Sequence, residues 1–267
     1  MLKHTLSLIA LAAALLGSAP APAAAATGAN RVYRIMPLGD SITRGGGQTQ
    51  GQYVGYRGGL QAHLQAGAKG FRYNFVGSMS DAGAPDRNHE GHGGWTIDSL
   101  AAHVDGWLTD FRPDIVLLHA GTNDLTYGDS PVATAGKLRD LIARIRDHDA
   151  GTKIFVARII ESRDARRQPA TDAYQALIPG VVAYAGPNVY LVDQASVGGT
   201  DIFDLTHPND FGYSKMAYNW YRSMNVVLGG GRWASVVSPY KAKVATICQI
   251  QYDTDRRRVC RNRVVSP

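Results

Sequence analysis

The chain has 267 residues, of which 45% are hydrophobic and 19% charged, a composition that is ordinary for a globular protein. The net charge of +6 is carried by residues 230–267, which hold eight Lys and Arg against two Asp, so residues 4–229 are close to neutral. A positive charge confined to one end argues against a nucleic-acid-binding protein.

The N-terminal residues have the order of a secretory signal peptide. Lys3 precedes an apolar run at 6–16 that is too short to span a bilayer, and small residues at 24–26 provide an Ala-x-Ala cleavage site. The alternative, an anchor helix, is disfavoured because no charged stop follows the run. We therefore predict a signal peptide at 1–26 and a secreted protein, extracellular or periplasmic, with a mature chain of about 240 residues. No later segment is long and apolar enough to be a membrane helix.

Apolar strand-like runs alternate along the mature chain with longer segments of helical period. Five strands separated by helices imply an α/β fold with a parallel sheet covered on both faces. Ligands of such sheets bind beyond the carboxyl ends of the strands, so we looked for catalytic residues in the loops that follow them. The predicted strands are 32–38, 73–76, 114–120, 153–160 and 188–192, and the predicted helices are 56–66, 97–111, 135–147, 171–185 and 211–228.

A serine follows the first strand, in the sequence Gly39-Asp40-Ser41. A strand-to-helix turn places a serine hydroxyl at the mouth of the sheet, beside backbone N–H groups that have no partner within the helix. Ser41 is therefore a candidate nucleophile. The alternative for an Asp-Ser pair at this position is a helix cap or a turn without catalytic function.

Residues 89–96 combine two histidines and a glutamate with three glycines. His89, Glu90 and His92 suggest zinc, but a zinc-protease helix requires two histidines four residues apart, and these are three apart. We therefore predict no metal ligands in this segment. A Gly-rich turn before a helix instead offers backbone N–H groups, such as that of Gly94, which a substrate can approach closely.

Two further candidates lie in later loops. Asn123 follows the third strand, where its amide can donate to a developing oxyanion; an Asx turn is the alternative. Asp204 and His207 are three residues apart before the last helix. A hydrogen bond between them would fix the imidazole tautomer and leave the other ring nitrogen free to take a proton from a serine. The alternative is a capping Asp beside a surface His.

Taken in order, Gly-Asp-Ser, the Gly before Trp-Thr, Gly-Thr-Asn-Asp and Asp-x-x-His resemble the four sequence blocks of the SGNH (GDSL) hydrolases. The chain is more particularly similar to the acetyl xylan esterases of carbohydrate esterase family three, and the likeness runs over residues 33–228. It rests on the residues at 36–41, 56–57, 75–78, 89–92 and 94–97.

The resemblance implies a three-layer α/β/α, flavodoxin-like fold with a five-stranded parallel sheet, and no metal or organic cofactor. It also implies a serine esterase, which is a carboxylic ester hydrolase. In it Ser41 is the nucleophile, His207 the general base and Asp204 the residue that orients the base. Gly94 and Asn123 would join the Ser41 backbone N–H in the oxyanion hole.

The chain departs from the family pattern at two positions that flank the site. Arg44 stands where the family commonly has Glu, and Gly93 where a Ser is frequent. Both differences could alter substrate preference without touching the three catalytic residues.

The resemblance points to acetyl esters on xylan or a related polysaccharide as substrates. A lipase, phospholipase or thioesterase would keep the same four blocks, and a non-catalytic carbohydrate-binding protein is the alternative from another class. Nucleic acid is not expected as a partner. Aromatic side chains in the active-end loops could stack on sugar rings or serve ordinary packing; they are Tyr53, Tyr56, Trp95 and Tyr127.

Glycines 229–231 divide the predicted hydrolase domain, 27–229, from the basic extension, 230–267. Arginines of this extension suggest docking to an anionic polymer, and the alternative is a solvated tail that aids solubility.

Two runs of strand-forming residues in the extension, 244–252 and 259–265, flank turn residues at 253–255. We predict a hairpin in which Cys248 lies opposite Cys260. Because export leads to an oxidising compartment, we also predict a disulfide between them.

Overall fold

A computed structural model describes residues 31–47, 53–241, 243–252 and 258–266, with side chains described as far as residue 241. The predicted signal peptide, 1–26, and the predicted turn residues, 253–255, lie outside the described residues.

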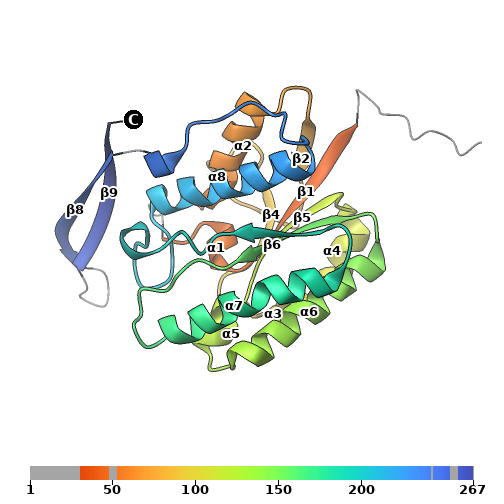
Figure 1. The fold of residues 1–267 in the computed structure, drawn as a ribbon, viewed down its shortest axis with the longest axis horizontal. Coiled ribbons are helices and arrows are strands. Elements are labelled where there is room, and N and C mark those ends of the chain that lie inside the picture. The colour runs from red at the N-terminus through yellow and green to blue at the C-terminus, as the bar shows by residue number, and fades with distance from the viewer. Residues whose placement is uncertain (1–30, 48–52, 242, 253–257, 267) are drawn as a thin grey trace, which may run out of the picture. The chain divides into compact units, whose positions relative to one another are not determined.

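The described chain is built on a seven-stranded, mostly parallel sheet (Figure 1). Its order is β3-β4-β1-β5-β6-β7, and β2 pairs with β1 on the same edge as β4. All neighbours are parallel except β3 and β4. The strands are β1 (Val32–Gly39), β2 (Arg72–Phe75), β3 (Met79–Ser80), β4 (Asn88–Gly91), β5 (Ile115–His119), β6 (Lys153–Arg158) and β7 (Val189–Asp193).

The predicted α/β class and the five predicted strands are present, but the sheet has seven strands rather than five. The additional strands are β3 and β4. β3 has only two residues, and β4 carries His89 and Glu90 where a buried strand usually carries apolar side chains. Both side chains are fully buried because hydrogen bonds satisfy them, so an apolar pattern could not reveal this strand. Residues 89–91, expected as part of a Gly-rich turn at 89–96, therefore lie in a strand.

Each predicted helix is present, but 97–111 forms two helices rather than one, and the short helices at 41–44 and 122–126 were not predicted. The helix breaks at His103, whose N–H bonds to the carbonyl of Leu100, and the His103 ring packs against Trp95 and Trp107. The helices are α1 (Ser41–Arg44), α2 (Gly55–Gly67), α3 (Ile97–Ala101), α4 (Val104–Phe111), α5 (Thr122–Thr126), α6 (Pro131–His148), α7 (Gln168–Ala185) and α8 (Asp210–Val227), with 3₁₀ turns η1 (Gly199–Asp201) and η2 (Pro239–Lys241).

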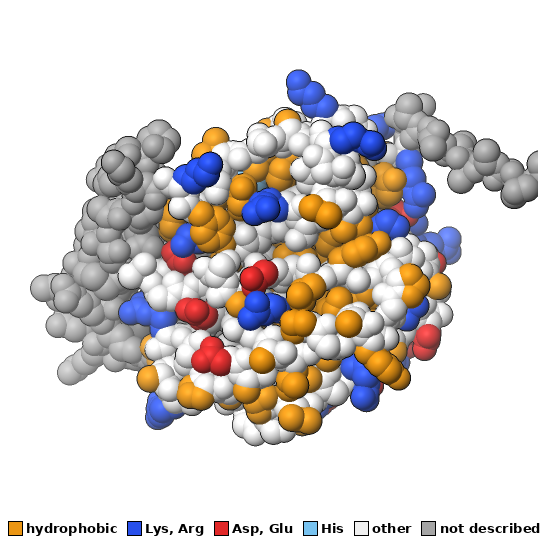
Figure 2. Space-filling view, in the orientation of Figure 1, with side chains coloured by type: hydrophobic (Ala, Val, Ile, Leu, Met, Phe, Trp, Pro, Cys, Tyr) orange, Lys and Arg blue, Asp and Glu red, His pale blue; other side chains and the backbone are white. Residues whose placement is uncertain are grey.

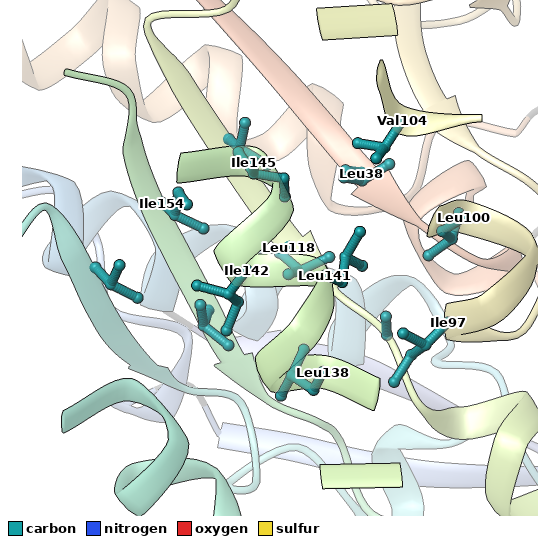
Figure 3. Packing of buried hydrophobic residues seen from close by; sticks show 14 of the residues in the cluster. Leu38, Ile97, Leu100, Val104, Leu118, Leu138, Leu141, Ile142, Ile145 and Ile154 are labelled. Atoms are coloured by element: carbon teal, nitrogen blue, oxygen red, sulfur yellow. The ribbon is translucent and has the colours of Figure 1, made fainter. Parts of the chain in front are cut away.

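The helices bury the two faces of the sheet in two separate apolar clusters. On one face, side chains of β1, β5 and β6 pack against α3, α4, α6 and α7. Figure 3 labels residues of this cluster from the three strands and from α3, α4 and α6. On the other face, alternate residues of the same strands pack against α2 and α8. Side chains alternate across a strand, so one set of strands supplies both clusters and the fold has three layers.

Part of the predicted extension packs on α2 and α8. The Trp233 ring packs at a tilt against Tyr221 of α8 and against Phe71 after α2, with centroids 5.8 and 4.9 Å away. The N–H of Ala234 bonds to the carbonyl of Gly67 in α2 at 2.9 Å. Beyond this segment, β8 (Lys243–Tyr252) and β9 (Arg258–Ser266) form the predicted antiparallel hairpin, whose register sets Cys248 opposite Cys260.

Among the described residues, no helix is long and apolar enough to cross a membrane. In the view of Figure 2, Lys and Arg side chains are dispersed among apolar and acidic ones, which agrees with the near-neutral charge of residues 4–229.

Gly121 begins the turn from β5 into α5 and packs closely against Tyr174 of α7. Its φ is +114°, and a Cβ at this position would lie 2.5 Å from the Tyr174 ring, which is held by a bond from its hydroxyl to the Ala120 carbonyl. We expect Gly121→Ala to lower the free energy of unfolding by about 3 kcal/mol, from backbone strain and steric overlap together. Gly128 has a similar φ of +102° with no atom near its Cβ position, so Gly128→Ala should cost only about 1 kcal/mol. Denaturant unfolding measures both, and equal losses would show that the Tyr174 contact does not matter.

Candidate active site

Ser41 is the first residue of α1, directly after β1 ends at the carboxyl edge of the sheet. The preceding Asp40 is buried and caps this helix, because its Oδ1 accepts a hydrogen bond of 2.8 Å from the Ile42 N–H. Burial raises the pKa of Asp40 to about 6, against the opposing effects of that hydrogen bond and of the His207 charge. The cap fixes the turn, and Ser41 itself remains partly exposed.

A hydrogen-bonded chain joins Ser41 to the two residues predicted beside it. The Ser41 Oγ lies 2.8 Å from His207 Nε2, and His207 Nδ1 lies 2.8 Å from Asp204 Oδ2. The other Asp204 oxygen accepts from the N–H groups of Thr206 and His207, at 2.6 and 2.8 Å. With Asp204 accepting at Nδ1, the imidazole carries its proton there and presents a lone pair to the serine hydroxyl.

The charges in this hydrogen-bonded chain lower the pKa of Asp204 and raise that of His207. Burial acts to raise the pKa of Asp204, but the hydrogen bond and charge of His207, with the two backbone N–H groups, lower it to about 2. Burial acts to lower the pKa of His207, and the hydrogen bond and charge of Asp204 raise it above the ordinary value. The carboxylate is therefore placed to stabilise an imidazolium at His207.

Two glycines allow the loop after α1 to pass directly against the histidine. A Cβ on Gly46 would lie 2.7 Å from His207 Cδ2, and one on Gly47 would lie 2.7 Å from His207 Cβ. The Tyr213 hydroxyl of α8 donates to the Gly46 carbonyl at 2.6 Å and holds this loop in place. A larger side chain at either glycine would displace the imidazole.

The predicted oxyanion residues Gly94 and Asn123 lie in the loop before α3 and in α5, and these two segments are bonded to each other. Asn123 Nδ2 donates to the Trp95 carbonyl at 2.8 Å, and the Tyr127 hydroxyl donates to the Gly94 carbonyl at 3.2 Å. The buried Asp124 carboxylate also accepts from the Ile97 N–H at 3.0 Å. Because an amide has two N–H hydrogens, Asn123 keeps one that is not used in the bond to Trp95.

The polar residues considered as zinc ligands are engaged in holding β4 and the loop after it. His89 Nδ1 accepts from the Gly91 N–H at 3.0 Å and its Nε2 donates to Asp81, while burial lowers its pKa to about 3. The buried Glu90 accepts from Ser78 Oγ and lies 2.8 Å from His92 Nε2.

The His92 ring is stacked between two tryptophans, with its centroid 4.2 Å from that of Trp95 and 4.9 Å from that of Trp107. This stack anchors the loop that carries Gly94. Together with the hydrogen bonds above, it gives His89, Glu90 and His92 structural partners within the protein.

The sequence model of the GDSL-like lipase/acylhydrolase family matches residues 38–215, which include all the candidate residues described above. The chain belongs to this family. The match confirms the predicted resemblance and the predicted class, a carboxylic ester hydrolase.

Several relatives of this GDSL-like protein are carbohydrate esterases. A solved family 3 carbohydrate esterase of Clostridium thermocellum is 34% identical, with a TM-score of 0.65 and coverage of 76% of this chain and 100% of that one. A multidomain esterase of Ruminococcus flavefaciens is 31% identical over 238 residues, 77% of this chain and 30% of that protein. A protein of Acetivibrio thermocellus described as an endoglucanase is 34% identical over 134 residues, 48% of this chain and 57% of that one. The chain thus spans about half or less of the length of these two curated relatives.

The two departures from the family pattern lie beside the GDSL serine. Arg44 Nε bonds to Asp81 Oδ2 at 2.9 Å, and its guanidinium lies over the Tyr53 ring, 4.4 Å from the centroid. A Cβ on Gly93 would be 4.0 Å from the Cβ of Ser41. A serine side chain at position 93 would therefore sit beside Ser41, and glycine leaves that volume open.

Arg57 has a role in this GDSL-like site that the sequence analysis did not assign, although Tyr-Arg at 56–57 was part of the family pattern. Its buried guanidinium donates to the carbonyls of Thr43, Arg44, Tyr53 and Arg87. Burial lowers its pKa to about 10, so it stays charged at neutral pH. It binds the end of α1 to the loops around it, and no spacing rule indicates such a partner set.

We expect Arg57→Met to lower the free energy of unfolding by about 3 kcal/mol or more, since buried carbonyls would lose their donors. Arg44→Met is the matched control: it removes a half-buried ion pair to Asp81 and should cost less than about 1 kcal/mol. Denaturant unfolding of both variants measures the difference, and similar losses would mean that Arg57 does not hold these loops.

Proposed function

We propose that the chain is a secreted serine esterase that hydrolyses short-chain, acetyl esters on xylan or a related polysaccharide. The observation that carries this proposal is the hydrogen-bonded chain from Ser41 through His207 to Asp204. A serine held by a histidine whose other nitrogen faces a carboxylate is the arrangement that activates a hydroxyl for acyl transfer.

In the first step His207 Nε2 takes the Ser41 proton as Oγ attacks the ester carbonyl. Asp204 holds the imidazole and stabilises its positive charge, and the imidazolium then protonates the leaving sugar hydroxyl. The serine is left as an acyl-enzyme. Water, deprotonated by His207, attacks the acyl carbonyl and releases the acid and the free serine by the reverse steps.

The oxyanion of each tetrahedral intermediate would be bound by the N–H groups of Ser41 and Gly94 and by the amide of Asn123. Support comes from the bonds that tie the Gly94–Trp95 carbonyls to α5 and leave one Asn123 hydrogen available. Donors fixed before reaction need no reorganisation as charge develops, which is why each contributes strongly to the rate.

Support for a carbohydrate ester comes from the esterase relatives and from exposed aromatic side chains in the loops around the candidate site. Of the aromatic residues considered, Tyr56 is fully buried and Trp95 is in the stack with His92, so both serve packing. Tyr127 and Tyr53 are 67% and 40% exposed and keep ring surface that a sugar could meet, although the Arg44 guanidinium lies over one face of Tyr53. Tyr127 is also bonded to Gly94, which sets it next to the proposed oxyanion donors.

Lipase, phospholipase or thioesterase activity would use the same Ser-His-Asp chain, and they differ from the proposal in the acyl and alcohol groups accepted. A non-catalytic carbohydrate-binding role is disfavoured, because binding alone does not require a serine bonded to a histidine–carboxylate pair.

Secretion is proposed from the signal-peptide pattern at 1–26. It is consistent with a disulfide in the basic extension, 230–267, which we propose from the register of Cys248 and Cys260. The disulfide would close the hairpin, and the arginines of the hairpin would bind an anionic polymer.

The proposal predicts that Ser41→Ala abolishes acetate release from acetylated xylan and from 4-nitrophenyl acetate, with a loss of about a millionfold in turnover. The wild-type rate should fall as the acyl chain of 4-nitrophenyl esters lengthens. Circular dichroism should show an unchanged fold in the variant. Appreciable turnover by a purified, folded Ser41→Ala protein would contradict the nucleophile assignment, and a preference for long acyl chains would favour a lipase.

A sugar contact at Tyr127 predicts that Tyr127→Ala raises KM for acetylated xylan about fivefold, equivalent to about 1 kcal/mol of lost stacking, with little change for 4-nitrophenyl acetate. Tyr127→Phe keeps the ring and should behave like the wild type on the polymer. Tyr184, 82% exposed on α7, provides the control Tyr184→Ala, for which no effect is expected. If Tyr127→Ala slowed both substrates equally, its contact with Gly94 rather than a sugar would be the reason.

A further inference from the structure

The turn that carries His207 has no regular secondary structure and is held by polar contacts. An isolated bridge between Ile202 and Pro208 closes it, and the Phe203 N–H bonds to the His207 carbonyl at 2.7 Å. From the loop after β6, the Arg163 N–H and the Ser162 hydroxyl both donate to the Leu205 carbonyl. The orientation of the imidazole therefore depends on neighbouring loops.

Arg167, the residue before α7, makes a further link to this turn. Its Nη2 donates to Thr206 Oγ1 at 3.0 Å and its Nη1 donates to Thr126 Oγ1 at 2.9 Å. Nε pairs with Asp164 at 3.2 Å, which fixes the plane of the guanidinium. One planar group thus connects the residue preceding His207 to α5, the helix that carries Asn123.

We propose that Arg167 is a positioning residue that aligns the His207 turn with α5, and so sets the general base relative to the proposed oxyanion donors. This rests on the proposed esterase function. The guanidinium can span both threonines because its donors diverge in a rigid fork, which a lysine ammonium cannot reproduce. Small displacements of a catalytic base reduce rates strongly, by up to about a hundredfold for 1 Å.

The charge of Arg167 also acts on the base. The charged groups that face His207 are Asp204 on its own turn, Asp40 in the turn after β1, and Arg167. The two carboxylates raise the pKa of His207, and Arg167 opposes them. Loss of the Arg167 charge should therefore move the acid limb of the kcat/KM profile to higher pH, since the base must be neutral to act.

Arg166 offers a matched control for local charge. Its side chain is 90% exposed and pairs with the same Asp164 carboxylate, and the structure gives it no bond to Thr126 or Thr206. A general effect of losing positive charge in this loop would appear in both arginine variants, whereas alignment requires Arg167 alone.

The kinetic test uses the full chain and 4-nitrophenyl acetate. We expect Arg167→Met to lower kcat about tenfold with little change in KM and to shift the acid limb upward. Arg167→Lys and the double variant Thr126→Val/Thr206→Val should lower kcat while keeping the wild-type pH profile. Arg166→Met should match the wild type in both. If Arg167→Met and Arg166→Met have the same kcat and pH profile, the inference is overturned.

A second readout does not depend on activity. In the Ser41→Ala background, the His207 ring can be titrated by NMR and assigned by comparison with a His207→Gln variant. Arg167→Met should raise the titration midpoint of His207, and Arg166→Met should leave it nearly unchanged. An unmoved midpoint in Arg167→Met would contradict the inference even if the wild type hydrolysed no ester, an outcome that would separately overturn the proposed function.

Discussion

The contact of 2.8 Å between Ser41 Oγ and His207 Nε2 joins two turns that are 166 residues apart in sequence, and the surrounding loops are built to permit it. The serine follows β1, an interior strand of the sheet. β1 pairs with β5 on one side and with β2 and β4 on the other. The histidine arrives from a turn before α8. Because Gly46 and Gly47 have no side chains, the loop after α1 can pass against His207 without displacing the imidazole.

Polar groups, rather than apolar packing, hold the loops at this edge. The apolar clusters lie between sheet and helices, so the loops beyond the strand ends expose backbone carbonyls and N–H groups that need partners. Buried charged side chains supply them. Arg57 donates to four backbone carbonyls, and Asp124 accepts from the N–H of Ile97 at the start of α3. Glu90 links Ser78 to His92. Each such group is costly to bury alone and stable only with its full set of partners.

The sequence predicted those parts of the fold that have a periodic signal. Five strands and most helices follow from apolar patterning, and the motif residues follow from being placed after strand ends, which brings Ser41, Asp204 and His207 together. β4 was missed because hydrogen bonds, not apolar character, bury its side chains. Arg57 and Arg167 were missed because their partners are carbonyls and hydroxyls of several separate loops, and composition or spacing does not encode such contacts.

Residues that hold the loops in place and residues that lie beside Ser41 should affect substrate specificity differently. Arg57 and Arg167 act on backbone and hydroxyl groups of the loops, so changes there should affect every substrate alike. Arg44 and Gly93 are the departures from the family pattern. The Arg44 side chain bonds to Asp81 and lies over Tyr53, and Gly93 leaves open volume beside Ser41. Variation at such positions changes the space and charge that a substrate meets while the distances between Ser41, His207 and Asp204 stay the same. Relatives that share the catalytic geometry can therefore differ in the esters they accept.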